Sequence, residues 1–224
     1  AHAYRKQNYD ARVHPLPPVP VPTPYPGHQL GLKKFIDEAR RLAKFQSEDG
    51  IVKVFDSFED NGTAYIIMEY LDGMTLTDYL KQVGTIPEDT AVGMLMPVME
   101  SLKNVHEQGI IHRDIAPDNI FITKTGEVKL IDFGASRYAT TTHSRSLTVI
   151  VKPGYSPEEQ YRSRGDQGPH TDVYSLSATL YKMLTGKTPP DAMERRAKYE
   201  NQNKDILRLL LNCLYFLESG KRSE

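Results

Sequence analysis

The spacing of apolar positions predicts a helix followed by a strand pair near the start of the chain. From residue 31 to about Gln46, apolar side chains recur every three or four positions, which is the period of an amphipathic helix. Two apolar runs then occupy 51–58 and 63–71. Asp-Asn-Gly at 60–62 lies between them and is typical of a tight turn. The sequence therefore predicts a hairpin after the first helix.

A second, longer helix is predicted at 87–108. Thr85 precedes Glu88 by three residues, with Pro87 between them, and this combination favours a capped helix start. Gly109 is placed to end the helix. Its methionine-rich stripe could line a ligand surface, but core packing is the better interpretation. The stripe comprises Met94, Leu95, Val98, Met99, Leu102 and Val105.

Further strands and helices are predicted beyond this point. Apolar runs at 120–122 and 128–131 predict a second strand pair joined by a turn. A weakly patterned stretch rich in Ser and Thr predicts a loop at 135–150. Helical spacing returns in a helix that Thr171 is expected to cap and Gly186 to end, and the tail beyond it also looks helical.

Residues 1–30 differ from the rest in composition. Seven of the twelve positions from Pro15 to Pro26 are proline, which is excluded from helix interiors and central strands. Such a stretch can be a ligand for an SH3-type domain, but a linker or leader agrees better with the composition. We therefore expect residues 1–30 to be a Pro-rich leader or linker without a fixed fold.

The overall composition is that of a soluble globular protein, with 39% apolar and 25% charged residues among 224. A net charge of −1 offers no basic footprint, so no nucleic-acid partner is expected. The single cysteine, Cys213, excludes an internal disulfide and fits a reducing compartment. The longest apolar run, 206–217, is too short to cross a bilayer, and no secretory signal is visible. These observations predict a cytoplasmic protein without a membrane segment.

Two short segments concentrate the residues that phosphoryl transfer needs. Positions 112–119 read HRDIAPDN, and positions 132–134 read DFG. Asp114 can accept a hydroxyl proton, while Asn119 and Asp132 can hold a metal ion on nucleotide phosphates. His-Arg-Asp at 112–114 or Asp-Phe-Gly at 132–134 alone could arise by chance, but both occur in this order with a predicted strand pair between them. The combination favours a phosphotransfer site.

Taken together, these segments resemble the catalytic loop and the metal-binding loop of the protein kinase family. The predicted elements from about 31 to 190 are similar in order to those of bacterial serine/threonine kinases. The resemblance implies an α+β fold, with a remnant of the small lobe and the hinge at 31–71 and a mostly helical large lobe at 72–224. It also implies ATP and Mg²⁺ as cofactors and a protein substrate phosphorylated on a Ser or Thr hydroxyl.

The resemblance also assigns residues to ATP binding. Glu38 matches the helix carboxylate that pairs with a strand lysine on the phosphates, although a solvated helix carboxylate is the alternative. Met68 matches the residue that limits the depth of the adenine pocket, and backbone groups of Glu69 and Leu71 would hydrogen-bond adenine. Phe121 matches the apolar floor below adenine, a position that a plain core residue would occupy equally well.

Other positions match structural and regulatory contacts of the family. Asp172 matches a buried Asp that braces the backbone of the catalytic loop. Glu159, or alternatively Glu158, matches the carboxylate of a structural salt bridge. Arg113 would meet a phosphorylated side chain of the activation loop. Candidates for that side chain are Thr140, Thr141, Thr142, Ser144, Ser146 and Thr148.

Two departures from the family concern the ends of the resemblance. No Gly-rich phosphate loop and no strand lysine precede Glu38. The earlier lysines are Lys6, Lys33 and Lys34, and none of them lies in a strand pattern. The sequence also stops before the helices that would hold the arginine partner of Glu159. The chain is therefore expected to be a fragment that binds ATP weakly and is nearly inactive as printed.

A third departure lies inside the catalytic loop. Serine/threonine kinases usually carry a lysine two residues after the catalytic Asp, and this chain has Ala116 there. Tyrosine kinases also carry Ala, but with an Arg two residues later, where this chain has Asp118. At the position of the family's threonine before Pro-x-Tyr, this chain has Lys152. Lys152 is either a plain surface lysine or a catalytic residue that reaches back and supplies the missing charge.

Two other functions are compatible with the motifs. A pseudokinase or docking module would keep the fold without turnover, although intact Asp114, Asn119 and Asp132 argue against it. A small-molecule phosphotransferase of kinase-like fold, such as an aminoglycoside kinase, usually lacks the residue type of Arg113 and the Phe-Gly ending of DFG. The serine/threonine kinase interpretation is therefore preferred.

Overall fold

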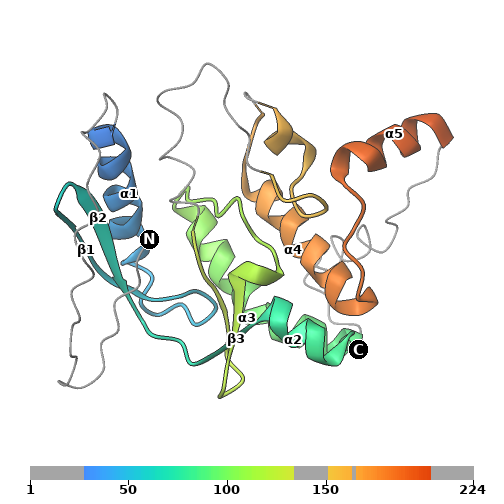
Figure 1. Ribbon diagram of the computed structural model, residues 1–224, viewed down its shortest axis with the longest axis horizontal. Helices are drawn as coiled ribbons and strands as arrows, with labels where there is room; N and C mark the ends of the chain where they lie inside the picture. Colours follow the sequence, from blue (N-terminus) through green and yellow to red (C-terminus); the bar gives the residue numbers. More distant parts are fainter. Residues whose placement is uncertain (1–27, 134–150, 163–164, 203–224) are drawn as a thin grey trace. The chain divides into compact units, whose positions relative to one another are not determined.

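The computed structural model describes residues 28–133, 151–162 and 165–202 (Figure 1). The predicted loop at 135–150 lies outside the described residues, and so do its six candidate phosphosites. The apolar run at 206–217, with Cys213, also lies outside them. The described residues form two compact units, of which the first contains 28–48 and 52–72 and the second contains the rest.

The first unit consists of a helix packed on a two-stranded antiparallel hairpin. Helix α1 (His28–Leu42) contacts both β1 (Val54–Asp60) and β2 (Thr63–Met68), and Figure 1 shows it beside the two strands. Ile36 and Ala39 are buried on the face of α1 that these contacts cover. Burial of this apolar stripe supplies the driving force for the helix to dock on the hairpin.

The predicted hairpin turn is confirmed. Asp60 pairs with Thr63 across the end of the hairpin. Asn61 and Gly62 between them have φ angles of 50° and 69°. Two successive left-handed residues match the right-handed twist of a hairpin, and Asn-Gly is the pair that adopts them most readily.

The first helix begins and ends earlier than predicted. It starts at His28, inside the segment 1–30 that was expected to lack a fixed fold, and it stops at Leu42 instead of continuing to about Gln46. Beyond Leu42 the amide of Phe45 donates to Leu42 O at 3.0 Å, a three-residue spacing that tightens the chain out of the α-helix. The side-chain amide of Gln46 then donates to backbone carbonyls of this loop and of β1.

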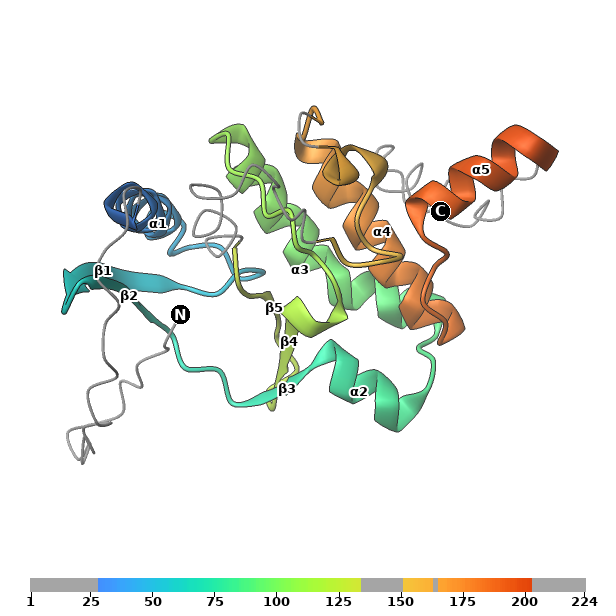
Figure 2. The same ribbon diagram turned by 45° about the horizontal axis from the view of Figure 1, so that its top comes forward.

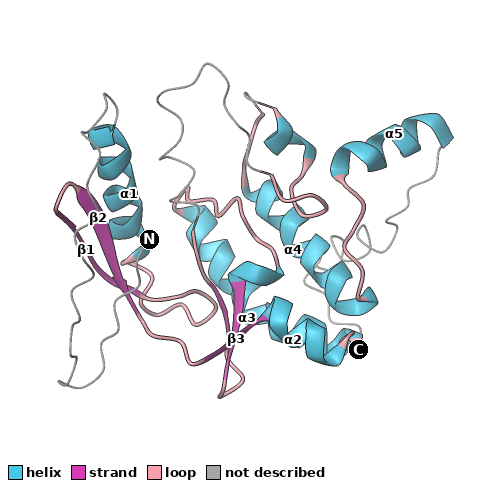
Figure 3. Cartoon of the chain, viewed as in Figure 1, coloured by secondary structure: helices cyan, strands magenta, loops and turns pink. Residues whose placement is uncertain are grey.

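The second unit combines a three-stranded antiparallel sheet, in the order β3-β4-β5, with four α-helices and two short 3-10 helices (η1 and η3) among the described residues. Helix α3 contacts β5 and α4, and Figure 2 shows α3 and α4 running side by side. Figure 3 shows how far helix outweighs strand in this unit. Its elements are β3 (Gly73–Thr75), α2 (Leu76–Val83), α3 (Glu88–Glu107), η1 (Pro117–Asn119), β4 (Ile120–Thr123), β5 (Val128–Leu130), η3 (Glu158–Tyr161), α4 (Pro169–Thr185) and α5 (Ala192–Gln202). The protein has an α+β fold.

The strand predicted at 51–58 is divided between the two units. Strand β1 starts only at Val54. Ile51 instead forms an isolated bridge with Leu130 of β5, and Gly50 O accepts a hydrogen bond from Leu130 N at 2.8 Å. The apolar character of 51–58 therefore serves two different cores, which a continuous run in the sequence cannot reveal.

Gly50 allows an unusually close approach of the backbone to helix α3. A Cβ at this position would lie 2.0 Å from the carbonyl oxygen of Pro97. The amide of Gly50 donates to Ser101 Oγ of the same helix at 3.0 Å. Only a residue without a side chain fits this contact, which anchors the 49–51 segment to α3.

The predicted helix starts are wrong in detail, although the helix ends are confirmed. Thr85 does not cap α3, which begins at Glu88 directly after Pro87 and has no side-chain cap. Thr171 lies in the first turn of α4, where its hydroxyl accepts from the amide of the preceding Gly168. As expected, glycines in the left-handed region follow both helices, Gly109 with φ 70° and Gly186 with φ 69°.

Strand β3 and helix α2 have no counterpart among the predicted elements. Thr75, the last residue of β3, caps α2 by accepting a hydrogen bond from Asp78 N at 3.2 Å. Apart from this cap the segment carries little periodic signal, because α2 is only eight residues long.

Across the described ranges, no helix is both long and apolar enough to cross a membrane.

Candidate active site

The loop that carries Asp114 leaves α3 and is braced by a buried carboxylate of α4. Asp172 is 0% exposed, and its two oxygens accept from the backbone amides of His112 at 2.8 Å and Arg113 at 2.7 Å. Arg113 has a φ of 68°, a left-handed conformation that a non-glycine residue adopts only under constraint. The two charge-assisted hydrogen bonds supply that constraint. Asp172 therefore braces the backbone of the loop, as the resemblance to protein kinases implies.

His106 is a third partner of the same carboxylate. Its Nε2 lies 2.7 Å from Asp172 Oδ2, and the imidazole belongs to the last turn of α3. One carboxylate thus joins α3, α4 and the backbone of the loop. His106 was not predicted from the sequence, since it lies 66 positions from Asp172 and no spacing rule connects the two.

His112 ties the loop to the segment that contains Asp132. Its ring Nε2 lies 2.9 Å from Ile131 O, and the ring packs on Phe133 with centroids 4.6 Å apart. Burial holds the pKa of His112 below its usual value, so the neutral ring can donate from Nε2 and accept at Nδ1. Nδ1 accepts from the amide of Asp114 at 3.2 Å. One side chain therefore fixes the two predicted functional segments to each other.

Asn119 positions Asp114. Its side-chain amide nitrogen donates to Asp114 O at 2.7 Å and to Asp114 Oδ2 at 2.9 Å. Both bonds use the NH₂ group, so the carbonyl oxygen of this buried amide is directed away from Asp114. The carboxylate of Asp132, in an exposed residue with a φ of 60°, provides a second hard oxygen donor. An amide oxygen and a carboxylate are donors that Mg²⁺ accepts, so these residues fit that metal.

Lys152 brings a positive charge to the catalytic loop. Its Nζ lies 3.2 Å from Asp114 Oδ2 and 2.8 Å from Asp118 Oδ2. The lysine side chain is 28% exposed, whereas that of Asp118 is 55% exposed. Ala116, which lies between the two carboxylates in the sequence, is buried and carries no charge. The ammonium of Lys152 therefore lies beside the carboxylate of Asp114, and residue 116 contributes no charge there.

A compact turn fixes the backbone of Lys152. Its carbonyl oxygen accepts from the amides of Tyr155 at 3.0 Å and Ser156 at 2.9 Å, and its own amide donates to Ser156 Oγ at 3.0 Å. A few residues later, the side chain of buried Gln160 donates to Arg113 O at 2.7 Å. The segment around Lys152 is thus joined directly to the catalytic loop. Gln160 was not predicted from the sequence as a functional residue.

The two neighbouring carboxylates of this segment have different partners. Glu159 Oε1 accepts from Thr171 Oγ1 at 2.8 Å and lies 3.5 Å from His170 Nε2. Glu158 forms ion pairs with Arg162 and with Arg196 of α5. The assignment of the family's salt bridge to Glu159, or alternatively to Glu158, stays a prediction; within the described part of the chain, Arg162 and Arg196 pair with Glu158.

The predicted ATP-binding residues are distributed over both units. Phe121 is half-buried on β4 of the second unit. Met68, Glu69 and Leu71 belong to the first unit, where the amide of Glu69 is hydrogen-bonded to Lys53 O at 2.9 Å. Because this amide is already engaged, a hydrogen bond from this segment to a nucleotide would have to use backbone groups other than the amide of Glu69. Glu38 lies on α1, but its side chain is outside the described residues.

Comparison with known proteins identifies the family of the chain. The protein kinase domain family matches residues 26–221, and the chain belongs to this family. The serine/threonine-protein kinase PknL of Mycobacterium tuberculosis is 37% identical over 166 residues, which cover 74% of this chain and 41% of PknL. Serine/threonine-protein kinase PknB of Mycobacterium leprae is 38% identical over 163 residues, 70% of this chain and 26% of PknB.

A solved structure of PpkA-294 in its apo form has the same fold. It matches with a TM-score of 0.66 and 33% identity, over 84% of this chain and 68% of that chain. The chain spans about two fifths of the length of PknL and about a quarter of PknB.

Proposed function

We propose that this chain is the catalytic part of a protein serine/threonine kinase, which transfers the γ-phosphate of ATP to a protein hydroxyl. Membership of the family and the names of its curated relatives support the reaction class. The observation that carries the proposal for this chain is the cluster of Asp114, Asn119 and Lys152, in which one carboxylate oxygen meets both an amide donor and an ammonium.

In the proposed mechanism, Asp114 orients the acceptor hydroxyl and takes its proton. Asn119 holds the carboxylate in place through Oδ2. Asn119 and Asp132 would hold Mg²⁺, which neutralises charge on the phosphate oxygens when bound. Catalysis of this kind depends on positioned charge more than on covalent chemistry, so a preorganised cation beside Asp114 contributes directly to the rate.

We assign that cation to Lys152. Its ammonium lies beside the proposed base, and the residue two positions after Asp114 is the uncharged Ala116. The turn that fixes the backbone of Lys152 limits the reorganisation needed when negative charge develops on the transferred phosphate. Removing one preorganised charge-stabilising group of this type costs about 100- to 1,000-fold in rate.

The function itself is tested by binding and by phosphate incorporation. In a full-length version of the protein, Mg²⁺-ATP should raise the unfolding temperature, because a ligand that binds only the folded state stabilises it. Radiolabelled phosphate should appear on a generic protein substrate, and Asp114→Asn should abolish this incorporation. Stabilisation by Mg²⁺-ATP without Asp114-dependent transfer would favour a non-catalytic docking module. The absence of both effects would overturn the proposal.

Lys152 is tested by moving its charge. Lys152→Met should lower phosphate incorporation by about 100- to 1,000-fold, whereas Lys103→Met, which changes an exposed lysine of α3, should not. Adding Ala116→Lys to Lys152→Thr should recover part of the lost rate, because it returns a cation to the catalytic loop. Turnover of Lys152→Met near that of the unchanged chain would show that Lys152 is a plain surface lysine.

A further inference from the structure

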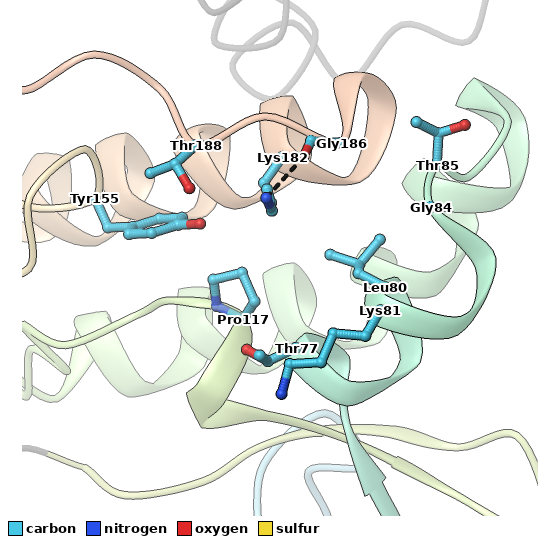
Figure 4. A pocket seen from close by; sticks show the side chains of 10 residues that line it. All are labelled: Thr77, Leu80, Lys81, Gly84, Thr85, Pro117, Tyr155, Lys182, Gly186 and Thr188. Atoms are coloured by element: carbon cyan, nitrogen blue, oxygen red, sulfur yellow. Dashed lines mark hydrogen bonds between the residues drawn. The ribbon is translucent and has the colours of Figure 1, made fainter.

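A pocket of about 520 Å³ lies in the second unit, beside the catalytic loop (Figure 4). Pro117 of η1, Leu80 of α2 and the ring of Tyr155 contribute apolar surface to it. Figure 4 shows Tyr155, Thr188 and Lys182 on one side of the pocket and Pro117 and Leu80 on the other. The volume lies within the range of pockets that bind small ligands, and it is large enough for one or two side chains of a bound protein.

The polar side of this pocket presents hydrogen-bond donors. Lys182 Nζ donates to Gly186 O at 2.7 Å, which uses one of the three N–H groups of an ammonium. Burial raises the pKa of Tyr155, and a hydrogen bond with the side chain of Thr188 acts in the opposite direction. The two hydroxyls are therefore partners, and because each carries one proton at neutral pH, one O–H of the pair is left to donate to a ligand. Such donors complement an anion more readily than a cation.

The charge of the lining has one sign. The residues that line the pocket include two lysines and no carboxylate. The carboxylate of Asp118, whose charge acts on Tyr155 from outside the lining, is paired with Lys152.

Lys81 is engaged with Asp78, with its Nζ 2.7 Å from Asp78 Oδ1, and Figure 4 shows its ammonium turned away from Lys182. Lys182 is therefore the cation that a ligand in the pocket would meet, and a basic side chain placed there would be repelled.

The walls of the pocket belong to the segments that hold the proposed catalytic groups. Pro117 lies three residues after Asp114 and opens the turn that ends at Asn119. Tyr155 lies three residues after Lys152, and its amide donates to Lys152 O. An extended substrate covers about 3.3 Å per residue, so a chain with its hydroxyl at Asp114 would reach this pocket within a few residues.

We propose that this pocket binds an anionic side chain of the protein substrate, a carboxylate or a phosphate, a few residues from the acceptor hydroxyl. The apolar wall accommodates the stem of the side chain, and the donors of Lys182 and of the Tyr155–Thr188 pair meet its charge. This inference rests on the proposed function, and it adds to that function a substrate class in which acidic or already phosphorylated sequences are preferred.

The test measures peptide preference in matched variants. Serine peptides carrying Glu, phosphoserine or Ala at each nearby position are compared by kcat/KM. One position should favour the anion over Ala about tenfold. Lys182→Met should reduce that ratio toward one, mainly through KM, and Lys182→Arg and Lys103→Met should keep it. Lys182→Glu should reverse the preference toward Lys or Arg at the same position. Glu and phosphoserine peptides separate the two sources of negative charge.

A binding assay separates this inference from the proposed function. Fluorescence anisotropy of the labelled anionic and Ala peptides on Asp114→Asn does not require turnover. A preference for the anionic peptide that disappears in Asp114→Asn/Lys182→Met supports the pocket even if no phosphate is transferred. Phosphate transfer without any anion preference, or a preference that survives Lys182→Met, would overturn the inference. Thermal unfolding of each variant verifies that the protein is folded.

Discussion

Asp172→Asn tests the brace of the catalytic loop with a minimal change in size. The carboxylate is 0% exposed and accepts from the amides of His112 at 2.8 Å and Arg113 at 2.7 Å. It also lies 2.7 Å from His106 Nε2. An asparagine amide has one acceptor oxygen, so it can serve only one of the two backbone amides. Its NH₂ group would then face the other donor.

The expected cost follows from these contacts. A hydrogen bond to a charged group contributes about 1.5–3 kcal/mol, and a buried donor left without a partner costs about 1–3 kcal/mol. Partial relaxation of Arg113 from its left-handed conformation, φ 68°, would offset a small part of this loss. We therefore expect the free energy of unfolding to fall by about 3–5 kcal/mol, the range seen when one partner of a buried charged pair is removed.

Urea unfolding followed by circular dichroism measures this change. The matched control is Asp166→Asn, the same substitution at an exposed residue, which should shift the free energy of unfolding by less than about 0.5 kcal/mol. A loss in Asp172→Asn below about 1 kcal/mol, the size of an ordinary neutral hydrogen bond, would refute the reasoning. It would mean that the loop keeps its conformation without the carboxylate.

Two further predictions concern packing and protonation. Gly50→Ala should cost about 1–3 kcal/mol, because its Cβ would lie 2.0 Å from Pro97 O, whereas Gly93→Ala, with open space around it, should not destabilise. Thermal unfolding that ranks the two variants equally would contradict this. Burial lowers the pKa of His112, so the unfolded chain binds more protons and stability should fall below about pH 6.5. His112→Asn should flatten this decline in urea unfolding, and an unchanged slope would count against it.

The elements that could be predicted are those with a local signal at their ends. The hairpin around Asn61 and the ends of α3 and α4 depend on residues with left-handed backbone. Each of these residues is an Asn or a Gly, the types that adopt this conformation most readily, so the sequence alone indicates them. Strand β3 has only three residues and exists because it pairs with β4, for example Met74 with Ile122. Long-range pairing of this kind overrides local propensity, so neither composition nor period could predict the strand.

The residues of the candidate site likewise divide into those with a local sequence signal and those placed by long-range contacts. Asp114, Asn119 and Asp132 belong to a compact motif and were predicted from it. His106 and Gln160 were not, because their partners lie 66 and 47 positions away and are brought close only by the packing of α3 and α4 and by the turn after Lys152. Hydrogen-bond partners chosen by tertiary structure leave no periodic pattern in the chain.

The position of the proposed cation changes what the mechanism depends on. A lysine two residues after Asp114 would be carried by the same loop as the base. Lys152 instead belongs to the segment 151–162, which meets the catalytic loop through the hydrogen bond from Gln160 to Arg113 O and through the ion pairs of Lys152 with Asp114 and Asp118. Tyr155, a wall of the proposed anion pocket, belongs to the same segment. In the proposed function, docking of this segment therefore completes both the charge at the transferred phosphate and the recognition of the substrate, so the two should be gained or lost together.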